Sequence, residues 1–183
     1  MGRIIALTAA LLAACGGDSR PAADDGTPIG MSDPSSGAEA EATPAVEGSV
    51  ELALRRPDGS FIDIGELRGR EVLLFLFATF DAPSQMMLRP LEAFQRAHPE
   101  VVVLGVAAQP DARLLVDAYV HALSPPFPIT YDPEEALPAD PEVLGPIEAI
   151  PAVVLLDARG VVVSRRYGYL ETADLEAMLS ASR

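Results

Sequence analysis

Hydrophobic residues follow two different periods between residues 49 and 183. Two runs, 71–80 and 101–108, are apolar at nearly every position, which is typical of strands buried on both faces. Shorter strand-like segments flank Pro57-Asp58-Gly59 and the turn at 157–160, and each pattern predicts a β-hairpin. A further short strand is expected at 127–132.

Two longer segments have helical spacing instead. The first, 84–97, places four apolar residues on one face and contains Pro90, which should kink the helix; the four are Met87, Leu88, Leu91 and Phe94. The second, 111–123, has one face with Leu115, Tyr119 and Leu123.

The remaining helical signals lie near the C-terminus. Residues 140–150 predict a short helix or turn, and Thr172 is expected to cap a final helix that has Asp174 and Glu176 in its first turn. This order of elements predicts an α/β fold, in which a central mixed β-sheet is flanked by helices and preceded by an N-terminal β-hairpin extension.

The first fourteen residues have the pattern of a signal peptide. Arg3 precedes the apolar run 4–14, which is shorter than the roughly 20 residues that a membrane-spanning helix needs. The run ends in Leu12-Ala13-Ala14-Cys15, which resembles the bacterial lipoprotein signal, in which this cysteine is acylated. An ordinary signal peptide with an incidental cysteine, or a buried helix, are the alternatives.

Residues 15–48 then comprise the lipidated Cys15 and a linker rich in Gly, Ser, Pro, Ala and acidic residues. The linker has few large apolar side chains, and their burial cannot offset the loss of conformational entropy on folding, so we expect the linker to be disordered. As a flexible coil it would span roughly 30 Å. Gly16 and Gly17 follow the cysteine, so no aspartate retention signal is present. We therefore expect a lipid-anchored protein of the bacterial cell envelope that faces the periplasm, with the outer membrane favoured.

The chain carries 27 acidic residues against 13 basic ones, all arginine, and its formal net charge is −14. This balance argues against nucleic acid as a partner and against charge-driven docking on anionic lipid.

The folded part resembles the membrane-tethered TlpA-type thiol:disulfide oxidoreductases, which are thioredoxin-like. The segment LRGREVLLFLFATFDAPS is similar to the family pattern L-R-G-K-x-V-x-x-x-F-W-A-T-W-C-x-x-C, and PLEAF continues the match. VVVLGV, FPITYDP and IPAVVLLDARGVVVSRRYG correspond to later strands of the family. The resemblance implies a thioredoxin-like domain over residues 49–183.

The resemblance fails at the residues that carry the family's chemistry. The two active-site cysteines fall on Asp81 and Ser84, and the preceding tryptophan falls on Phe80. Two carboxylates that support the cysteines in many members fall on Phe75 and Met87. Because disulfide exchange requires attack by a thiolate on sulfur, these positions predict that no catalytic residue remains. An enzyme of the family's type is therefore disfavoured.

Asp81 and Ser84 have a structural explanation that needs no ligand. Aspartate is among the best helix N-caps, because its carboxylate is stabilised by the same helix end that would hold a thiolate. A ligand or partner contact is the functional alternative for Asp81. Ser84 is expected to be a first-turn residue without a role.

Pro151 falls where the family has a cis proline beside the active site. In the family, the residue before it offers backbone groups to an extended peptide, which is a form of strand addition. The resemblance therefore implies a peptide-binding groove lined by Phe80, Pro83, Ile150 and Pro151. The alternative is that this proline only shapes the start of a strand.

No cofactor or metal is expected. A related copper-handling group uses two cysteines and a histidine, but here that cysteine pair is missing. His98 is placed at a helix end, His121 on a polar face, and Met87 at a core position beside Met86.

Three functions remain open. The leading hypothesis is a redox-inactive module that binds extended segments of envelope proteins. The alternatives are a thiol:disulfide oxidoreductase, as the family implies, and a folded spacer without a ligand.

Overall fold

The computed structural model of the protein describes residues 48–135, 137 and 141–183. The expected signal peptide, Cys15 and the linker up to residue 47 lie outside the described residues. The strands are β1 (Ala53–Arg55), β2 (Phe61–Asp63), β3 (Val72–Phe77), β4 (Val102–Ala107), β5 (Ile129–Tyr131), β6 (Ala152–Leu156) and β7 (Val162–Tyr167). The helices are η1 (Ile64–Leu67), α1 (Ala82–Met86), α2 (Leu88–Ala97), α3 (Ala112–Leu123), α4 (Pro141–Leu144) and α5 (Thr172–Ser182).

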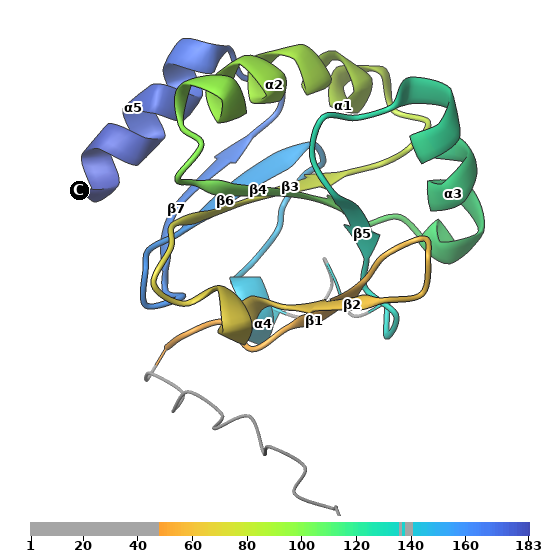
Figure 1. Ribbon diagram of the computed structural model, residues 1–183, viewed down its shortest axis with the longest axis horizontal. Coiled ribbons are helices and arrows are strands. Elements are labelled where there is room, and N and C mark those ends of the chain that lie inside the picture. Colours follow the sequence, from red (N-terminus) through yellow and green to blue (C-terminus); the bar gives the residue numbers. More distant parts are fainter. Residues whose placement is uncertain (1–47, 136, 138–140) are drawn as a thin grey trace, which may run out of the picture. The chain divides into compact units, whose positions relative to one another are not determined.

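The described strands form one mixed sheet in the order β2-β1-β5-β4-β3-β6-β7 (Figure 1). The central strands β3 and β4 are parallel, and β6 pairs antiparallel with β3. The expected hairpins form, since β1 pairs with β2 and β6 with β7. These pairings confirm the predicted mixed α/β sheet with an N-terminal hairpin.

The two faces of the sheet are covered differently. All six residues of β3 are buried, as the continuous apolar run predicted, because alternate side chains enter two separate cores. Phe75 and Phe77 stack at a centroid distance of 5.2 Å beneath α2, α3 and α5. Leu74 and Leu76 point into the other core, against the N-terminal hairpin and α4.

Pro90 has the effect that its geometry predicts. The helical segment is divided, with α1 ending at Met86 and α2 beginning at Leu88. A proline at position 90 cannot donate a hydrogen bond to the carbonyl of Met86, and its ring crowds that carbonyl. The interruption leaves Met87, Leu91 and Phe94 buried, as expected.

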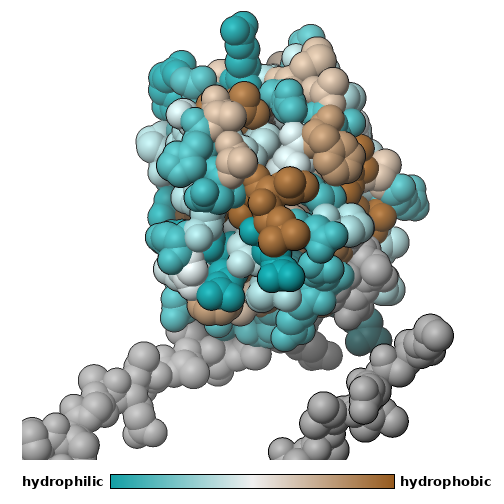
Figure 2. Space-filling view, turned by 90° about the vertical axis from the view of Figure 1, so that its right-hand side faces the viewer, coloured by the Kyte–Doolittle hydropathy of each residue, from teal (hydrophilic) through white to brown (hydrophobic). Residues whose placement is uncertain are grey.

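The predicted face of α3 is partly wrong. Tyr119 is buried, but Leu115 and Leu123 are 41% and 42% exposed, and Val116 takes the core position. Leu114 is 64% exposed, and Figure 2 shows apolar side chains gathered among polar ones on this side of the domain. The sequence offers two apolar stripes on this helix, and only the sheet decides which one is covered.

The cap of α5 also differs from the expectation. The N-cap is Glu171, and its backbone N–H donates to Asp174 Oδ2 at 2.9 Å. Thr172 is the first helical residue, and its hydroxyl donates to the carbonyl oxygen of Pro90 at 3.3 Å. Thr172 thus links α5 to α2.

Within the described part of the chain, no helix is long and apolar enough to cross a bilayer.

Tyr119 provides a test of this packing. Its hydroxyl is buried without a hydrogen-bond partner among the described residues, and burial raises its pKa from 10.0 to about 12. We expect Tyr119→Phe to raise the free energy of unfolding by about 1 kcal/mol, because it removes an unsatisfied polar atom.

The same residue should make stability depend on alkaline pH. The unfolded phenol ionises near its ordinary pKa of 10.0 while the folded phenol keeps its proton until about 12, so the free energy of unfolding should fall as pH rises between these values. Urea unfolding across this range should show a smaller fall for Tyr119→Phe. Tyr169→Phe, at a residue that is 46% exposed, is the matched control. Identical pH profiles for all three proteins would contradict this account.

Candidate functional site at the start of α1

The apex of the domain is the loop that leads from β3 into α1. Asp81 is the N-cap of α1, with φ −88° and ψ 124°, and its Oδ2 accepts a hydrogen bond from the backbone N–H of Ser84 at 2.8 Å. An acidic N-cap satisfies a free N–H group and interacts favourably with the positive end of the helix. The geometry is the structural cap that the sequence predicted.

Ser84 has a role that the sequence did not predict. It is fully buried, and its hydroxyl donates to Asp81 Oδ2 at 2.7 Å. The same hydroxyl accepts from the backbone N–H of Ala78 at 3.3 Å. The two positions that correspond to the family's cysteines are therefore joined by a hydrogen bond between oxygen atoms.

A second buried residue, Gln109, holds the loop between β3 and α1 in place through hydrogen bonds to Thr79. Gln109 accepts from the backbone N–H of Thr79 at 3.0 Å and donates to the Thr79 hydroxyl at 2.8 Å. Gln85 donates to the Thr79 carbonyl at 2.9 Å. Gln109 was not identified from the sequence, although a glutamine directly after the apolar run 101–108 marks the end of a buried strand.

The Ile150-Pro151 peptide bond is cis and lies next to this loop. Ala152 pairs with Leu76, so Pro151 stands beside the end of β3, from which the loop to Asp81 rises. The Pro151 carbonyl accepts from Gly168 N–H at 2.7 Å. The backbone of Ile150 forms no hydrogen bond with another described residue.

The other predicted groove residues differ in exposure. Phe80 is 74% exposed, and Pro83 is also exposed on α1. Ile150 is half-buried, and Pro151 is buried. The loop and the cis proline thus bring the exposed ring of Phe80 and the backbone of Ile150 to the same end of the sheet.

The positions that carry supporting carboxylates in the family are apolar and buried. Phe75 stacks on Phe77, and the sulfur of Met87 lies 3.1 Å from the backbone nitrogen of Leu170. The site therefore contains no base beneath the helix end. With a buried Ser84 hydroxyl and no thiol, the described site has no nucleophile for disulfide exchange.

The histidines lie away from this site. His98 follows α2, with Nδ1 3.5 Å from Glu100, and the side chain of His121 is 80% exposed and lies 3.6 Å from Asp117. In the described ranges, no three His, Cys, Asp or Glu residues are grouped as metal ligands.

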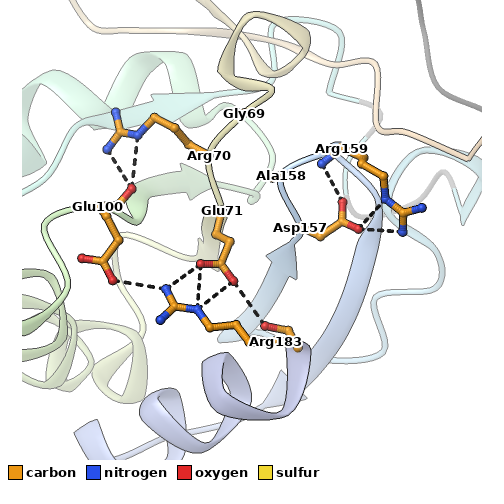
Figure 3. A pocket seen from close by; sticks show the side chains of 9 residues that line it. Gly69, Arg70, Glu71, Glu100, Asp157, Ala158, Arg159 and Arg183 are labelled. Carbon is orange, nitrogen blue, oxygen red and sulfur yellow. Dashed lines mark hydrogen bonds and ion pairs between the residues drawn. The ribbon is translucent and has the colours of Figure 1, made fainter.

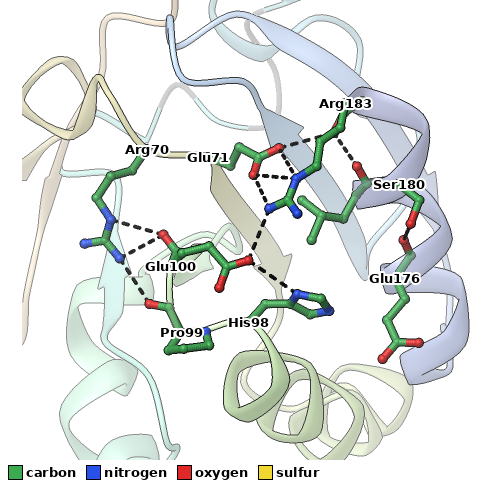
Figure 4. A network of polar contacts seen from close by, with 10 residues as sticks. Arg70, Glu71, His98, Pro99, Glu100, Glu176, Ser180 and Arg183 are labelled. Atoms are coloured by element: carbon green, nitrogen blue, oxygen red, sulfur yellow. Dashed lines mark hydrogen bonds and ion pairs between the residues drawn. The ribbon is translucent and has the colours of Figure 1, made fainter.

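A cavity of about 530 Å³, lined mostly by charged residues, lies at the opposite end of the sheet (Figure 3). Its charged side chains mostly pair with one another: Arg183 bonds Glu71 at 2.7 Å and Glu100 at 3.2 Å, as Figure 4 shows. The pKa of Glu100 is lowered by a hydrogen bond from the backbone N–H of Glu100 and, to a smaller extent, by Arg183. Hydrogen bonds to Glu71 and Glu100 raise the pKa of Arg183. We interpret this network as an attachment of the C-terminal residue Arg183 to Glu71 and Glu100.

The fold and the helix-end site define a thioredoxin-like protein. The redoxin family model matches residues 38–179, and the chain belongs to this family. No curated protein matches the sequence.

Solved structures of similar fold are thioredoxin-like proteins. StoA from Bacillus subtilis is 23% identical with a TM-score of 0.58, covering 74% of this chain and 99% of its own. The exposed lipoprotein thioredoxin Etrx1 from Streptococcus pneumoniae is 18% identical with a TM-score of 0.58, covering 71% and 98%. A DsbF homologue from Corynebacterium diphtheriae is 14% identical with a TM-score of 0.61, covering 73% and 85%. At these identities the likeness shows the fold alone.

The Ser84 hydroxyl should be important for stability. Ser84→Ala removes one hydrogen bond to Asp81 and leaves the buried N–H of Ala78 without its partner, so we expect a loss of roughly 1–3 kcal/mol in the free energy of unfolding. Urea denaturation measures this loss. Ser180→Ala, at an exposed serine that bonds Glu176, should change stability by less than about 0.5 kcal/mol. Equal effects of the two substitutions would refute the role of Ser84.

Proposed function

We propose that this redoxin is a redox-inactive module that binds extended polypeptide segments at the apex of its thioredoxin-like domain. The observation that carries the proposal is the oxygen–oxygen hydrogen bond between Asp81 and Ser84, which lies where the family pattern has sulfur. Disulfide exchange proceeds through a mixed disulfide, which neither a carboxylate nor a hydroxyl can form.

The binding part of the proposal rests on groups that do not depend on sulfur. The backbone N–H and C=O of Ile150 form no hydrogen bond with another described residue, which suits the addition of an extended strand. The exposed ring of Phe80 would offer apolar surface on the other side of the proposed groove. These groups favour a partner with an extended backbone and an apolar side chain.

The proposal also places the protein in the bacterial cell envelope, anchored by lipid at Cys15 and facing the periplasm. The supporting observation is the sequence Leu12-Ala13-Ala14-Cys15 after a short apolar run. Two or more acyl chains are required for stable anchoring. The linker would then hold the binding site away from the bilayer, where it can meet segments of envelope proteins.

Restoring sulfur tests whether activity was lost through these two residues. In a Cys15→Ser background, the full chain should not reduce insulin disulfides above the buffer rate. Asp81→Cys with Ser84→Cys should gain measurable turnover, because the two side chains already touch at the helix N-terminus, which favours a thiolate. Asp81→Cys alone is the matched control and should stay inactive. Turnover by the parent would overturn the proposal.

Peptide binding can be measured on an array of extended peptides. We expect Phe80→Ala to weaken binding at least about fivefold, since an apolar contact of this size contributes roughly 1–3 kcal/mol. Phe61→Ala, at a phenylalanine that is 58% exposed on β2, is the control and should bind as the wild type does. If no peptide binds the wild type, or both variants weaken equally, the groove is not the binding site.

The anchor is tested by metabolic labelling with palmitate in a bacterial host. The wild-type chain should be labelled, and Cys15→Ser should not be, because Cys15 is the sole cysteine of the sequence. Release of the variant into the soluble fraction should accompany the loss of label. An unlabelled wild type would remove the lipoprotein part of the proposal and leave the binding part untouched.

A further inference from the structure

Two side chains of the edge strand β7 hold the segment that leads to the cis proline. Arg165 Nε donates to the carbonyl oxygen of Leu144 at 2.7 Å, and the Tyr167 hydroxyl donates to the carbonyl oxygen of Pro146 at 2.9 Å. Both residues lie opposite positions of β6 whose side chains enter the core beside α4, so both side chains point to that face of the sheet. These two bonds therefore connect β7 to the chain that follows α4.

Gly145 allows this close approach. The residue has a φ of 75°, and a side chain built there would overlap the guanidinium group of Arg165. Glycine adopts a positive φ without strain and has no Cβ to occupy this space. The guanidinium group of Arg165 therefore lies directly against the backbone of the segment.

The segment has few other attachments before Pro151. Residues 147–150 form no backbone hydrogen bond with other described residues, and Glu148 is exposed. On the other side of Ile150, the Gly168 N–H donates to the Pro151 carbonyl at 2.7 Å. Contacts from the end of β7 thus hold the chain on both sides of Ile150.

We propose that Arg165 and Tyr167 are positioning residues that hold Ile150 in place for the addition of an extended strand. This inference rests on the proposed function, because it assigns a role in the same peptide-binding groove. Binding costs less free energy when the segment that accepts the partner is already ordered. Residues behind a binding site provide this order by restricting the groups that make the contact. Arg165 and Tyr167 act through the segment and not by touching the peptide.

Limited proteolysis of the full-length chain tests the positioning without any peptide. Endoproteinase Glu-C cleaves after glutamate, and Glu148 is exposed within the segment. Tyr167→Phe and Arg165→Met should each raise the initial rate of cleavage after Glu148 at least about threefold, because the loss of one bond makes local opening more frequent. Cleavage after Glu92, inside α2, requires wider unfolding and should keep its wild-type rate.

Three further variants separate positioning from general effects. Arg165→Lys keeps a charged donor near the Leu144 carbonyl and should return the rate of cleavage after Glu148 to within about twofold of the wild-type rate. Arg166→Met and Tyr169→Phe are matched controls on and beside β7, since neither side chain forms a hydrogen bond or ion pair with a described residue. Both controls should be cleaved as the wild type is.

Peptide affinity shows whether this order serves binding. The probe is a fluorescein-labelled peptide of serine and threonine with one central leucine, which offers an extended backbone and a single apolar side chain. Tyr167→Phe and Arg165→Met should each weaken binding of this probe at least about threefold, because the binding step must then also order the segment. Arg165→Lys should restore the affinity together with the resistance to cleavage.

The two hypotheses fail in different ways. A wild type that does not bind the probe would refute the proposed function, and with it a groove for these residues to position. If the wild type binds, unchanged cleavage after Glu148 or unchanged affinity in both Tyr167→Phe and Arg165→Met would overturn the positioning role alone. Equal increases in cleavage after Glu92 and after Glu148 would also overturn it, because the two residues would then stabilise the whole domain.

Discussion

The carboxylate of Asp81 accepts two hydrogen bonds from one residue, the backbone N–H and the hydroxyl of Ser84. These bonds fix the start of α1 above the end of β3, and the same hydroxyl also accepts from Ala78. In this fold a helix end at the apex of the sheet favours negative charge, whether it sits on a thiolate or on a carboxylate. Asp81 retains the charge and the geometry, but an oxygen anion cannot exchange disulfides.

The loss of sulfur leaves the rest of the apex in place because other contacts position it. Gln109 holds Thr79 from the end of β4, and the register of β3 with β6 places Pro151 beside the loop. Neither contact involves Asp81 or Ser84. The peptide-binding surface that we propose is therefore separable, in physical terms, from the thiol chemistry of the family.

The two ends of the sheet are built on different principles. The apex presents the exposed ring of Phe80 and the backbone of Ile150, which forms no hydrogen bond with another described residue. The opposite end binds its charges internally, with Arg183 between Glu71 and Glu100. Surface ion pairs individually contribute little to the free energy of unfolding. We therefore expect this network to stabilise the last turn of α5 locally and to add little to the stability of the domain. In the described sheet, the edge strand β7 runs between the two ends.

The strands, the order of elements and the residues at the helix end could all be read from the amino-acid sequence. Continuous apolar runs and turn residues are local signals, so the hairpins and the buried strand β3 could be predicted, as could the interruption at Pro90. Other features depend on contacts between segments that are distant in the sequence. Leu115 and Val116 compete for one core position, and the sheet beneath α3 selects Val116. Ser84 is fully buried only because β3 and α1 meet there, and Gln109 acquires its role from Thr79, thirty positions away. Such roles are set by packing and by the satisfaction of buried hydrogen-bonding groups, and no periodic pattern in the sequence records them.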